Sequence, residues 1–266
     1  MPRFKTLEVS NPAYESNNLR FITVNTPNLK GRGDIVVYVP PETLKTDTLP
    51  VVILLHGVYG SAWSWAHSGG VHLKVNELIT SGELPTMILA MPSDGLWSDG
   101  SAYLAHDGYD FEKWIVDDVP DALCECVWGA AKESPMFISG LSMGGFGALR
   151  IGAKYGAKFR AISGHSSITS LSQMKYFTDE PLIHYAQDDF TSGDIFETFL
   201  KYRISLPPIR FDCGANDILI NYNRALHKKM EQENIPHIYQ ENPGTHEWPY
   251  WTTHITDSLK FFADKL

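Results

Sequence analysis

Cysteine is scarce in this chain. The 266 residues contain three cysteines, Cys124, Cys126 and Cys213, which are too few for a disulfide framework. The segment Cys124-Glu125-Cys126 also lacks the two-residue spacer and the second ligand pair that a zinc site requires. We therefore expect buried or half-buried free thiols rather than crosslinks or metal ligands.

The sequence also has no long apolar segment. Its longest aliphatic run is Val51 to Leu55, and the first 15 residues hold no apolar stretch of signal-peptide length. These features predict a soluble protein of the cytoplasm with no membrane partner, unless an export signal has been removed from the chain.

Positive charge is the third shortage. Lysine and arginine number 22 against 31 aspartates and glutamates, which gives a formal charge of -9. Such a chain is repelled by phosphate backbones, so we expect no nucleic-acid partner. With 43% hydrophobic residues, no internal repeat and no low-complexity tract, the composition favours one α/β domain spanning 1–266.

Apolar runs of strand length alternate with segments of helical spacing. The expected strands cover about 35–39, 51–55, 86–91, 136–139, 161–163, 209–213 and 237–239. The expected helices cover about 71–81, 111–132, 143–155, 222–233 and 250–266. This alternation implies a mostly parallel sheet with helices on both faces. The first two runs have no obvious helix between them, which suggests an antiparallel start.

Two stretches depart from this regularity. Pro120 lies inside the longest helical segment and should kink or divide the helix near Asp118. The segment 166–204 is the least regular, because acidic residues and glycine interrupt its aromatic residues. We interpret it as a cap-like insertion over the carboxyl edge of the sheet rather than as a separate domain.

The motif Gly140-Leu141-Ser142-Met143-Gly144 stands between an expected strand and an expected helix. A serine in such a tight turn projects its Oγ above the sheet edge, and glycine two residues before and after it removes a clash. The Met143 N–H and the helix dipole then favour negative charge on a substrate oxygen. Ser142 is therefore a nucleophile candidate. The alternative is an ordinary capping serine at a glycine-rich helix start.

A serine nucleophile needs a base and an acid that orients the base. Asp217 follows an expected strand, and His246 lies in a Pro/Gly loop between the last expected strand and the terminal helix. The chain order Ser142, Asp217, His246 is the order found in α/β-hydrolases.

Other residues compete for these two roles. Asp212 should lie within its strand, which makes it a weaker acid candidate than Asp217. The remaining histidines near expected elements are interpreted as structural: His165, His237 and His254.

A glycine-containing loop follows the buried run at 51–55. Its sequence is His56-Gly57-Val58, and a loop of this kind can bring a backbone N–H beside the nucleophile. Val58 is thus the second oxyanion donor beside Met143, and Gly57 lets the loop pass closely. His56 should brace the loop by hydrogen bonding.

These motifs together resemble the esterase D, or putative esterase, family of α/β-hydrolases. The resemblance is carried by His56-Gly57, by Gly140-Leu141-Ser142-Met143-Gly144-Gly145 and by Gly244-Thr245-His246-Glu247-Trp248. The tributyrin-esterase type is the most similar branch, on Met91-Pro92-Ser93-Asp94-Gly95 and the ending at Trp251.

The resemblance implies an α/β-hydrolase fold and a serine carboxylesterase acting on short-chain acyl esters, including aryl or sugar esters. It gives Ser142, Asp217 and His246 as the triad, with Val58 and Met143 as oxyanion donors. It implies no metal and no organic cofactor. A thioesterase or S-formylglutathione hydrolase, and a non-catalytic binding protein on the same scaffold, remain alternatives.

Tryptophan is concentrated in the loops expected around Ser142. We expect four of these tryptophans to bind substrate: Trp63, Trp65, Trp97 and Trp248. A fifth, Trp251, lies beside the same loops. Flat apolar walls suit a small acyl group or an aromatic alcohol, although such residues also serve as ordinary packing. An exposed edge strand or the 166–204 segment would be the contact of a homo-oligomer.

Overall fold

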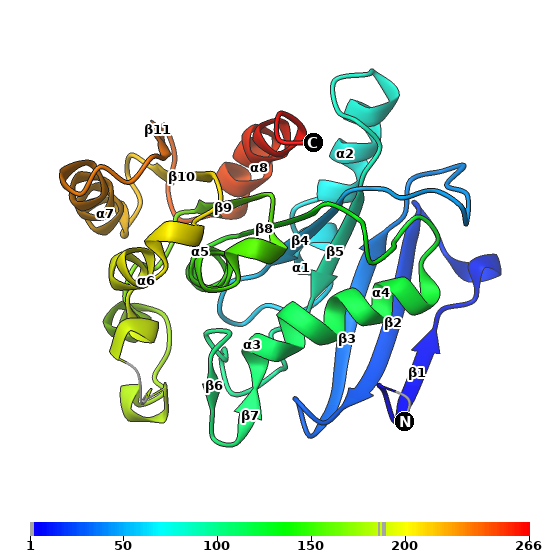
Figure 1. Ribbon diagram of the computed structural model, residues 1–266, viewed down its shortest axis with the longest axis horizontal. Coiled ribbons are helices and arrows are strands. Elements are labelled where there is room, and N and C mark those ends of the chain that lie inside the picture. Colours follow the sequence, from blue (N-terminus) through cyan, green and yellow to red (C-terminus); the bar gives the residue numbers. More distant parts are fainter. Residues whose placement is uncertain (1–2, 186, 188–189) are drawn as a thin grey trace.

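A nine-stranded sheet forms the centre of the computed structural model, which describes residues 3–185, 187 and 190–266 (Figure 1). Its strand order is β1-β2-β3-β5-β4-β8-β9-β10-β11. The strands are β1 (Thr6–Val9), β2 (Leu19–Thr26), β3 (Gly31–Tyr38), β4 (Val51–Leu55), β5 (Ile88–Pro92), β8 (Met136–Gly140), β9 (Ala161–His165), β10 (Ile209–Gly214) and β11 (Ile238–Asn242). A separate two-stranded ladder joins β6 (Ala105–His106) to β7 (Tyr109–Asp110).

The sheet is mostly parallel, as the sequence predicts. The strands from β5 and β4 through β11 pair in parallel, while β1, β2 and β3 pair antiparallel with one another, and β3 pairs antiparallel with β5. The expected antiparallel start is present, but β5 lies between β3 and β4, so the first two apolar runs are not neighbours. Strands β1 and β2 were not expected from the sequence, because β1 is largely exposed and polar residues separate the apolar residues of β2.

Helices cover both faces of the sheet (Figure 1). One face carries α1 (Ser64–His67), α2 (Val71–Thr80) and α8 (Trp248–Ala263). The other carries α3 (Phe111–Lys113), α4 (Val119–Cys126), α5 (Met143–Lys154), α6 (Ile195–Lys201) and α7 (Ile220–Gln232). Helix α2 shows why these helices pack on the sheet. Its apolar residues Val71, Val75 and Leu78 recur every three or four positions and form one buried stripe. In the described part of the chain, no helix combines the length and apolarity needed to cross a membrane.

The helix that contains Pro120 is divided where the sequence predicts. Between α3 and α4 the backbone widens into a π-helical turn over Trp114–Asp118. Proline has no N–H to donate to the carbonyl four residues earlier, which is that of Val116. The Lys158 Nζ lies 3.3 Å from this carbonyl oxygen and supplies a donor in its place. The helix then ends at Cys126, six residues before its expected end.

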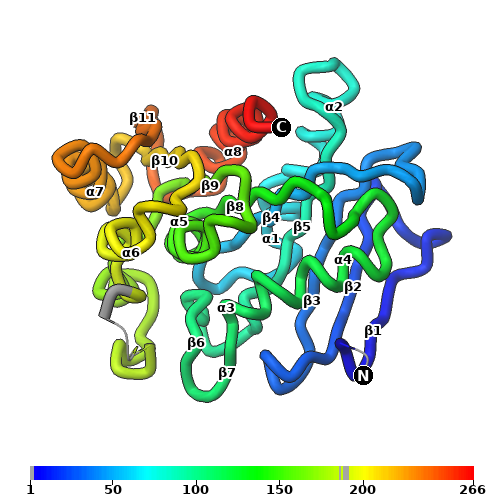
Figure 2. The backbone as a smooth tube through the Cα atoms, viewed as in Figure 1, coloured from blue at the N-terminus to red at the C-terminus, as the bar shows by residue number. Residues whose placement is uncertain are grey.

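The irregular segment 166–204 connects β9 to β10 and consists of short 3₁₀ turns followed by α6. Figure 2 shows its first part beside the β6–β7 hairpin. Ring contacts join the two, because Tyr185 packs against Trp97 and His106 at centroid distances of 5.4 and 5.5 Å. Residues 186, 188 and 189 of the expected insertion lie outside the described part.

A buried ionic cluster attaches α5 to α3. The Glu112 carboxylate accepts hydrogen bonds from Arg150, from Lys154 Nζ at 2.6 Å and from the Tyr155 hydroxyl at 2.7 Å. Burial by itself raises the pKa of Glu112, but the charge of Arg150 and these donors more than offset it and lower the pKa from 4.5 to about 2. Glu112 is therefore charged in the folded protein and counterbalances the buried Arg150.

We predict that Glu112→Gln destabilises the fold in a pH-dependent way. Because the folded pKa lies below the unfolded value, the carboxylate stabilises the fold above about pH 4.5 and loses this effect as the pH falls towards 2. Urea unfolding should show a deficit on the order of 3 kcal/mol at pH 7 that shrinks below pH 4.5. Glu77→Gln, in an exposed pair with Lys74, should change little at any pH. A deficit independent of pH would contradict the assignment.

Candidate active site

Ser142 occupies the tight turn between β8 and α5. Its backbone has φ 54° and ψ -117°, a left-handed conformation that costs a non-glycine residue on the order of 1–3 kcal/mol. The Ser142 N–H donates to the His165 carbonyl at the end of β9, at 2.9 Å. The side chain, 2% exposed, thus stands above the carboxyl edge of the sheet at the start of a helix.

The two flanking glycines are required by close backbone contacts. A Cβ at Gly140 would lie 2.3 Å from the Gly144 carbonyl oxygen, and a Cβ at Gly144 would lie 2.3 Å from the Leu55 carbonyl oxygen. Both are backbone atoms that no side-chain rotation can move away. The turn therefore fits between β4 and its own helix only with glycine at these positions.

Three polar side chains meet above this edge. The Ser142 Oγ lies 3.0 Å from His246 Nε2, and His246 Nδ1 lies 2.9 Å from Asp217 Oδ2 and 3.0 Å from Oδ1. The Asp217 carboxylate is buried and also accepts the Leu219 N–H at 2.8 Å. The arrangement suits proton transfer from a hydroxyl to an imidazole that a carboxylate orients.

The loops that carry Asp217 and His246 are joined by backbone hydrogen bonds. The Ala215 N–H donates to the Asn242 carbonyl at 2.8 Å, and the Asn216 N–H donates to the Gly244 carbonyl at 3.0 Å. The contact is so close that a Cβ at Gly214 would lie 2.6 Å from the Gly244 oxygen. The parallel pairing of β10 and β11 is thus continued beyond the strands, and it fixes Asp217 relative to His246.

Aromatic rings hold the His246 imidazole in place. Phe177 stacks on it with a centroid distance of 4.9 Å and an interplanar angle of 27°. Trp251 meets it edge-on at 5.0 Å and 89°. These rings leave 17% of the His246 side chain exposed, so one side of the imidazole remains open beside Ser142.

The loop after β4 passes directly against Ser142. A Cβ at Gly57 would lie 3.4 Å from the Ser142 Cβ. The Asp94 N–H donates to His56 Nε2 at 3.1 Å, so the imidazole proton is on Nδ1, which donates to the Gly57 carbonyl at 2.7 Å. The Gly57 carbonyl and the Val58 N–H belong to one planar peptide and point in opposite directions. His56 thereby fixes the direction of the Val58 N–H.

Two backbone donors remain unpaired beside Ser142. Within residues 3–185, 187 and 190–266, neither the Val58 N–H nor the Met143 N–H has a protein acceptor. Met143 begins α5, where the first N–H groups of a helix have no partner within the helix. Both N–H groups are therefore available to a developing oxyanion.

A cavity of about 650 Å³ opens beside Ser142 and His246. Its described lining is His56, Gly57, Val58, Tyr59, Gly60, Trp63, Ser64, Ser68, Leu141, Ser142, Tyr176, Phe177, His246, Glu247, Trp248 and Trp251. This lining contains no lysine or arginine, and Glu247 is its one acidic residue. The volume and the aromatic walls are typical of a small-molecule site.

The expectations for tryptophan need two corrections. Trp63 and Trp248 line the cavity, but Trp65 and Trp97 do not. Trp65 is 1% exposed, and its indole N–H donates to the Leu55 carbonyl beneath the loop. Trp97 packs against His106 at 4.5 Å, on the hairpin side of the insertion. Loop position in the sequence could not separate indoles that face the cavity from indoles that pack under it.

Three aromatic lining residues were not among the expected site residues: Tyr59, Tyr176 and Phe177. Tyr59 directly follows Val58, so its place next to the expected oxyanion loop could have predicted that it lines the cavity. Tyr176 and Phe177 lie in the insertion, and their place over the site depends on packing that no local pattern encodes. The Tyr59 hydroxyl donates to the Phe177 carbonyl and links the two groups.

The competing histidines are each engaged elsewhere. His165 is fully buried and is hydrogen-bonded to Asp212. His237 Nε2 lies 2.7 Å from His227 Nδ1. His254 Nδ1 lies 3.2 Å from Asp257 Oδ2. In the part of the chain that the structure describes, no three His, Cys, Asp or Glu side chains are grouped as a metal site.

The three cysteines are free thiols. Burial raises the pKa of Cys126 to about 11 and also raises the pKa of Cys124 and Cys213. Thiols of this kind are mostly protonated at neutral pH and are poor nucleophiles.

Comparisons with known proteins find similar esterases. The profile of the family described as "Putative esterase" matches residues 26–262. An acetyl esterase of Caldicellulosiruptor saccharolyticus is 27% identical over 265 residues, covering 92% of this chain and 91% of that protein.

Solved structures share the fold. A ferulic acid esterase superposes with a TM-score of 0.78 at 23% identity, covering 99% of this chain and all of that chain. An S-formylglutathione hydrolase of Staphylococcus aureus superposes with a TM-score of 0.79 at 17% identity, covering 96% and 99% of the two chains. These similarities show an α/β-hydrolase fold with the mostly parallel sheet described above.

We predict that Gly144→Ala destabilises the protein by at least about 2 kcal/mol, since the new methyl group meets a backbone oxygen. Gly31→Ala is the matched control, because its Cβ would meet no atom closer than 3.6 Å. Urea unfolding followed by circular dichroism measures both. Equal unfolding midpoints for the two variants would show that the turn is not packed as described.

Proposed function

This chain belongs to the putative esterase family and is a carboxylic ester hydrolase, and from that premise we propose that Ser142, His246 and Asp217 form its catalytic triad. The observation that supports this assignment most strongly is the double engagement of the imidazole. His246 lies within hydrogen-bond distance of both the Ser142 hydroxyl and the Asp217 carboxylate. A serine hydroxyl without such a base is a poor nucleophile at neutral pH.

In the proposed first step, His246 Nε2 accepts the Ser142 proton while Oγ attacks the ester carbonyl carbon. The carbonyl oxygen becomes an oxyanion, and the protonated imidazole then donates to the departing alcohol. The products of this step are an acyl-enzyme and a free alcohol. Water repeats the sequence on the acyl-enzyme and releases the carboxylic acid.

Asp217 keeps His246 in the tautomer that this transfer needs. Its carboxylate receives the Nδ1–H, so the Nε2 lone pair faces Ser142. The same carboxylate stabilises the imidazolium that forms during the step. In the serine-protease template this contribution is worth around 10⁴ in rate.

The Val58 and Met143 N–H groups are the proposed oxyanion hole. Met143 adds the amino end of α5, whose dipole favours negative charge. Val58 adds an N–H whose direction is fixed by the His56–Gly57 hydrogen bond. A donor of this kind contributes about 3–4 kcal/mol to the transition state when it is preorganised.

The proposed substrates are uncharged short-chain acyl esters, including esters of aromatic alcohols. Tyr59, Trp63 and Trp248 offer flat apolar surfaces in the cavity, and Tyr176 and Phe177 from the segment 166–204 add two more aromatic rings to its lining. Glu247 and the net charge of -9 disfavour anionic substrates and favour release of the carboxylate product.

The charge of the cavity lining also bears on the thioesterase alternative. The described lining provides no cation for the carboxylates of a glutathione thioester. A non-catalytic binding protein would not require the strained Ser142 backbone or the two unpaired N–H groups. The lining without lysine or arginine therefore supports neutral esters, and the strained serine with its two unpaired N–H groups supports hydrolysis.

We predict that Ser142→Ala lowers kcat for a short p-nitrophenyl ester by about 10⁶, since loss of the nucleophile disables the triad as a unit. Ser81→Ala, at the end of α2, is the control and should match the wild type. Activity should be measured in a host lacking other esterases. Retention of near-full turnover by the alanine variant would refute the nucleophile.

A second prediction concerns chain length. Across p-nitrophenyl esters, kcat/KM should be highest for acyl chains of about two to four carbons, because the flat aromatic walls of the cavity suit a small acyl group. Initial rates over the series provide the measurement. A preference for chains beyond about eight carbons would contradict the proposed fit of a small acyl group.

A further inference from the structure

A second Ser–His–Asp row lies buried in the protein, apart from the proposed active site. Ser258 Oγ is 3.0 Å from His165 Nε2, and His165 Nδ1 is 2.9 Å from Asp212 Oδ2. All three side chains are fully buried, and none lines the cavity beside Ser142. This row repeats the polar pattern of a triad where no substrate can reach it.

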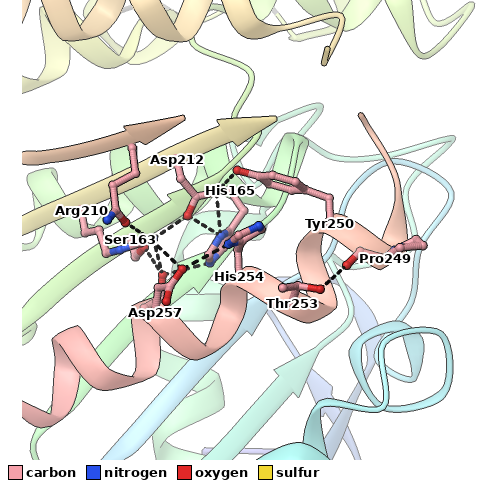
Figure 3. A network of polar contacts seen from close by, with 11 residues as sticks. Ser163, His165, Arg210, Asp212, Pro249, Tyr250, Thr253, His254 and Asp257 are labelled. Atoms are coloured by element: carbon pink, nitrogen blue, oxygen red, sulfur yellow. Dashed lines mark hydrogen bonds and ion pairs between the residues drawn. The ribbon is translucent and has the colours of Figure 1, made fainter. Parts of the chain in front are cut away.

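The Asp212 carboxylate is the centre of this network. Besides His165, it accepts hydrogen bonds from Arg210 and from the Tyr250 hydroxyl, the latter at 2.9 Å. Burial alone raises the pKa of Asp212, but His165 and Arg210 lower it to about 2, so the carboxylate is charged. Figure 3 shows these side chains converging from β9, β10 and α8.

Asp212 and two of its partners, His165 and Tyr250, lie on elements that adjoin the three proposed triad residues. The His165 carbonyl accepts the Ser142 N–H. Asp212 itself lies on β10, which leads into the loop of Asp217. Tyr250 lies in the first turn of α8, four residues after His246. One buried carboxylate therefore connects the supports of nucleophile, acid and base.

The Tyr250 ring also contacts the His246 loop directly. Gly244 adopts φ 144°, and a Cβ there would lie 2.5 Å from Tyr250 Cδ2. The Gly244 carbonyl in turn accepts the Asn216 N–H from the Asp217 loop. The ring thus supports the point where the two loops are joined, and its hydroxyl is anchored on Asp212.

We propose that Asp212 and Tyr250 are positioning residues, whose hydrogen bond sets the His246 and Asp217 loops at the distance needed for proton transfer. This inference rests on the proposed triad function. A displacement near 1 Å of a catalytic group can cost about 10² in rate, so a modest relaxation of the loop would be measurable.

Tyr250→Phe tests the hydrogen bond while retaining the ring against Gly244. We expect kcat per titrated active site to fall about tenfold with KM within about twofold of wild type, because the loss affects chemistry rather than binding. The rate of phosphonylation by a small fluorophosphonate should fall in the same ratio, since that reaction uses the same proton transfer.

Tyr38→Phe is the matched control. Tyr38 is equally buried, its hydroxyl donates to Asn76 at 3.0 Å, and it lies on β3. The Tyr38→Phe variant should lose about as much thermal stability as Tyr250→Phe but keep the wild-type kcat and phosphonylation rate. Tyr250→Phe with wild-type rates and only a lowered melting temperature would overturn the inference.

Asp212→Asn gives a second test, because it retains the side-chain shape and removes the charge. We expect it to lower kcat and to be non-additive with Tyr250→Phe, since both act through one hydrogen bond. If the two losses in kcat add up in the double variant, the two residues do not act through a shared contact. If Asp212→Asn does not fold, Tyr250→Phe alone decides the question.

The two proposals fail in different ways. A wild-type enzyme that is not phosphonylated would refute the triad itself. A reactive wild type with an equally reactive Tyr250→Phe variant would refute only the positioning role.

Discussion

The hydrogen bonds of the His246 imidazole to Ser142 and Asp217 are the interaction on which the account of this protein depends. They span 104 residues of sequence between the serine and the histidine, and only the sheet makes them possible. β8, β10 and β11 run in parallel, so their carboxyl ends lie at one edge. The loops beyond them then continue the pairing through the Ala215 and Asn216 amides.

Several local features have a cost that this arrangement explains. Ser142 adopts a backbone conformation that is unfavourable for serine, and its flanking glycines permit contacts that any side chain would block. Buried charges at Glu112 and Asp212 are retained with full sets of partners. The strained Ser142 and the Asp212 network both adjoin the residues of the proposed triad, whereas the Glu112 cluster fastens α5 to α3.

The fold class and the three triad candidates could be predicted from the sequence, because each depends on local signals. Apolar runs mark the strands, and Ser142, Asp217 and His246 follow strands in the chain order of a known family. The roles of Trp65 and Trp97 could not be predicted, since burial under a loop depends on contacts distant in sequence. The stacking of Phe177 on His246 could not be predicted for the same reason. Asp212 was correctly placed within a strand, but its link to Tyr250 is visible only in three dimensions.

The most direct test is to map the site of covalent modification by a fluorophosphonate. The intact protein should gain one phosphonyl group, and peptide mass spectrometry should place it on Ser142. The buried Ser258, which has the same neighbours as a nucleophile but no access to solvent, should stay unmodified. An adduct on any other serine, or no adduct while the protein still hydrolyses esters, would contradict the account.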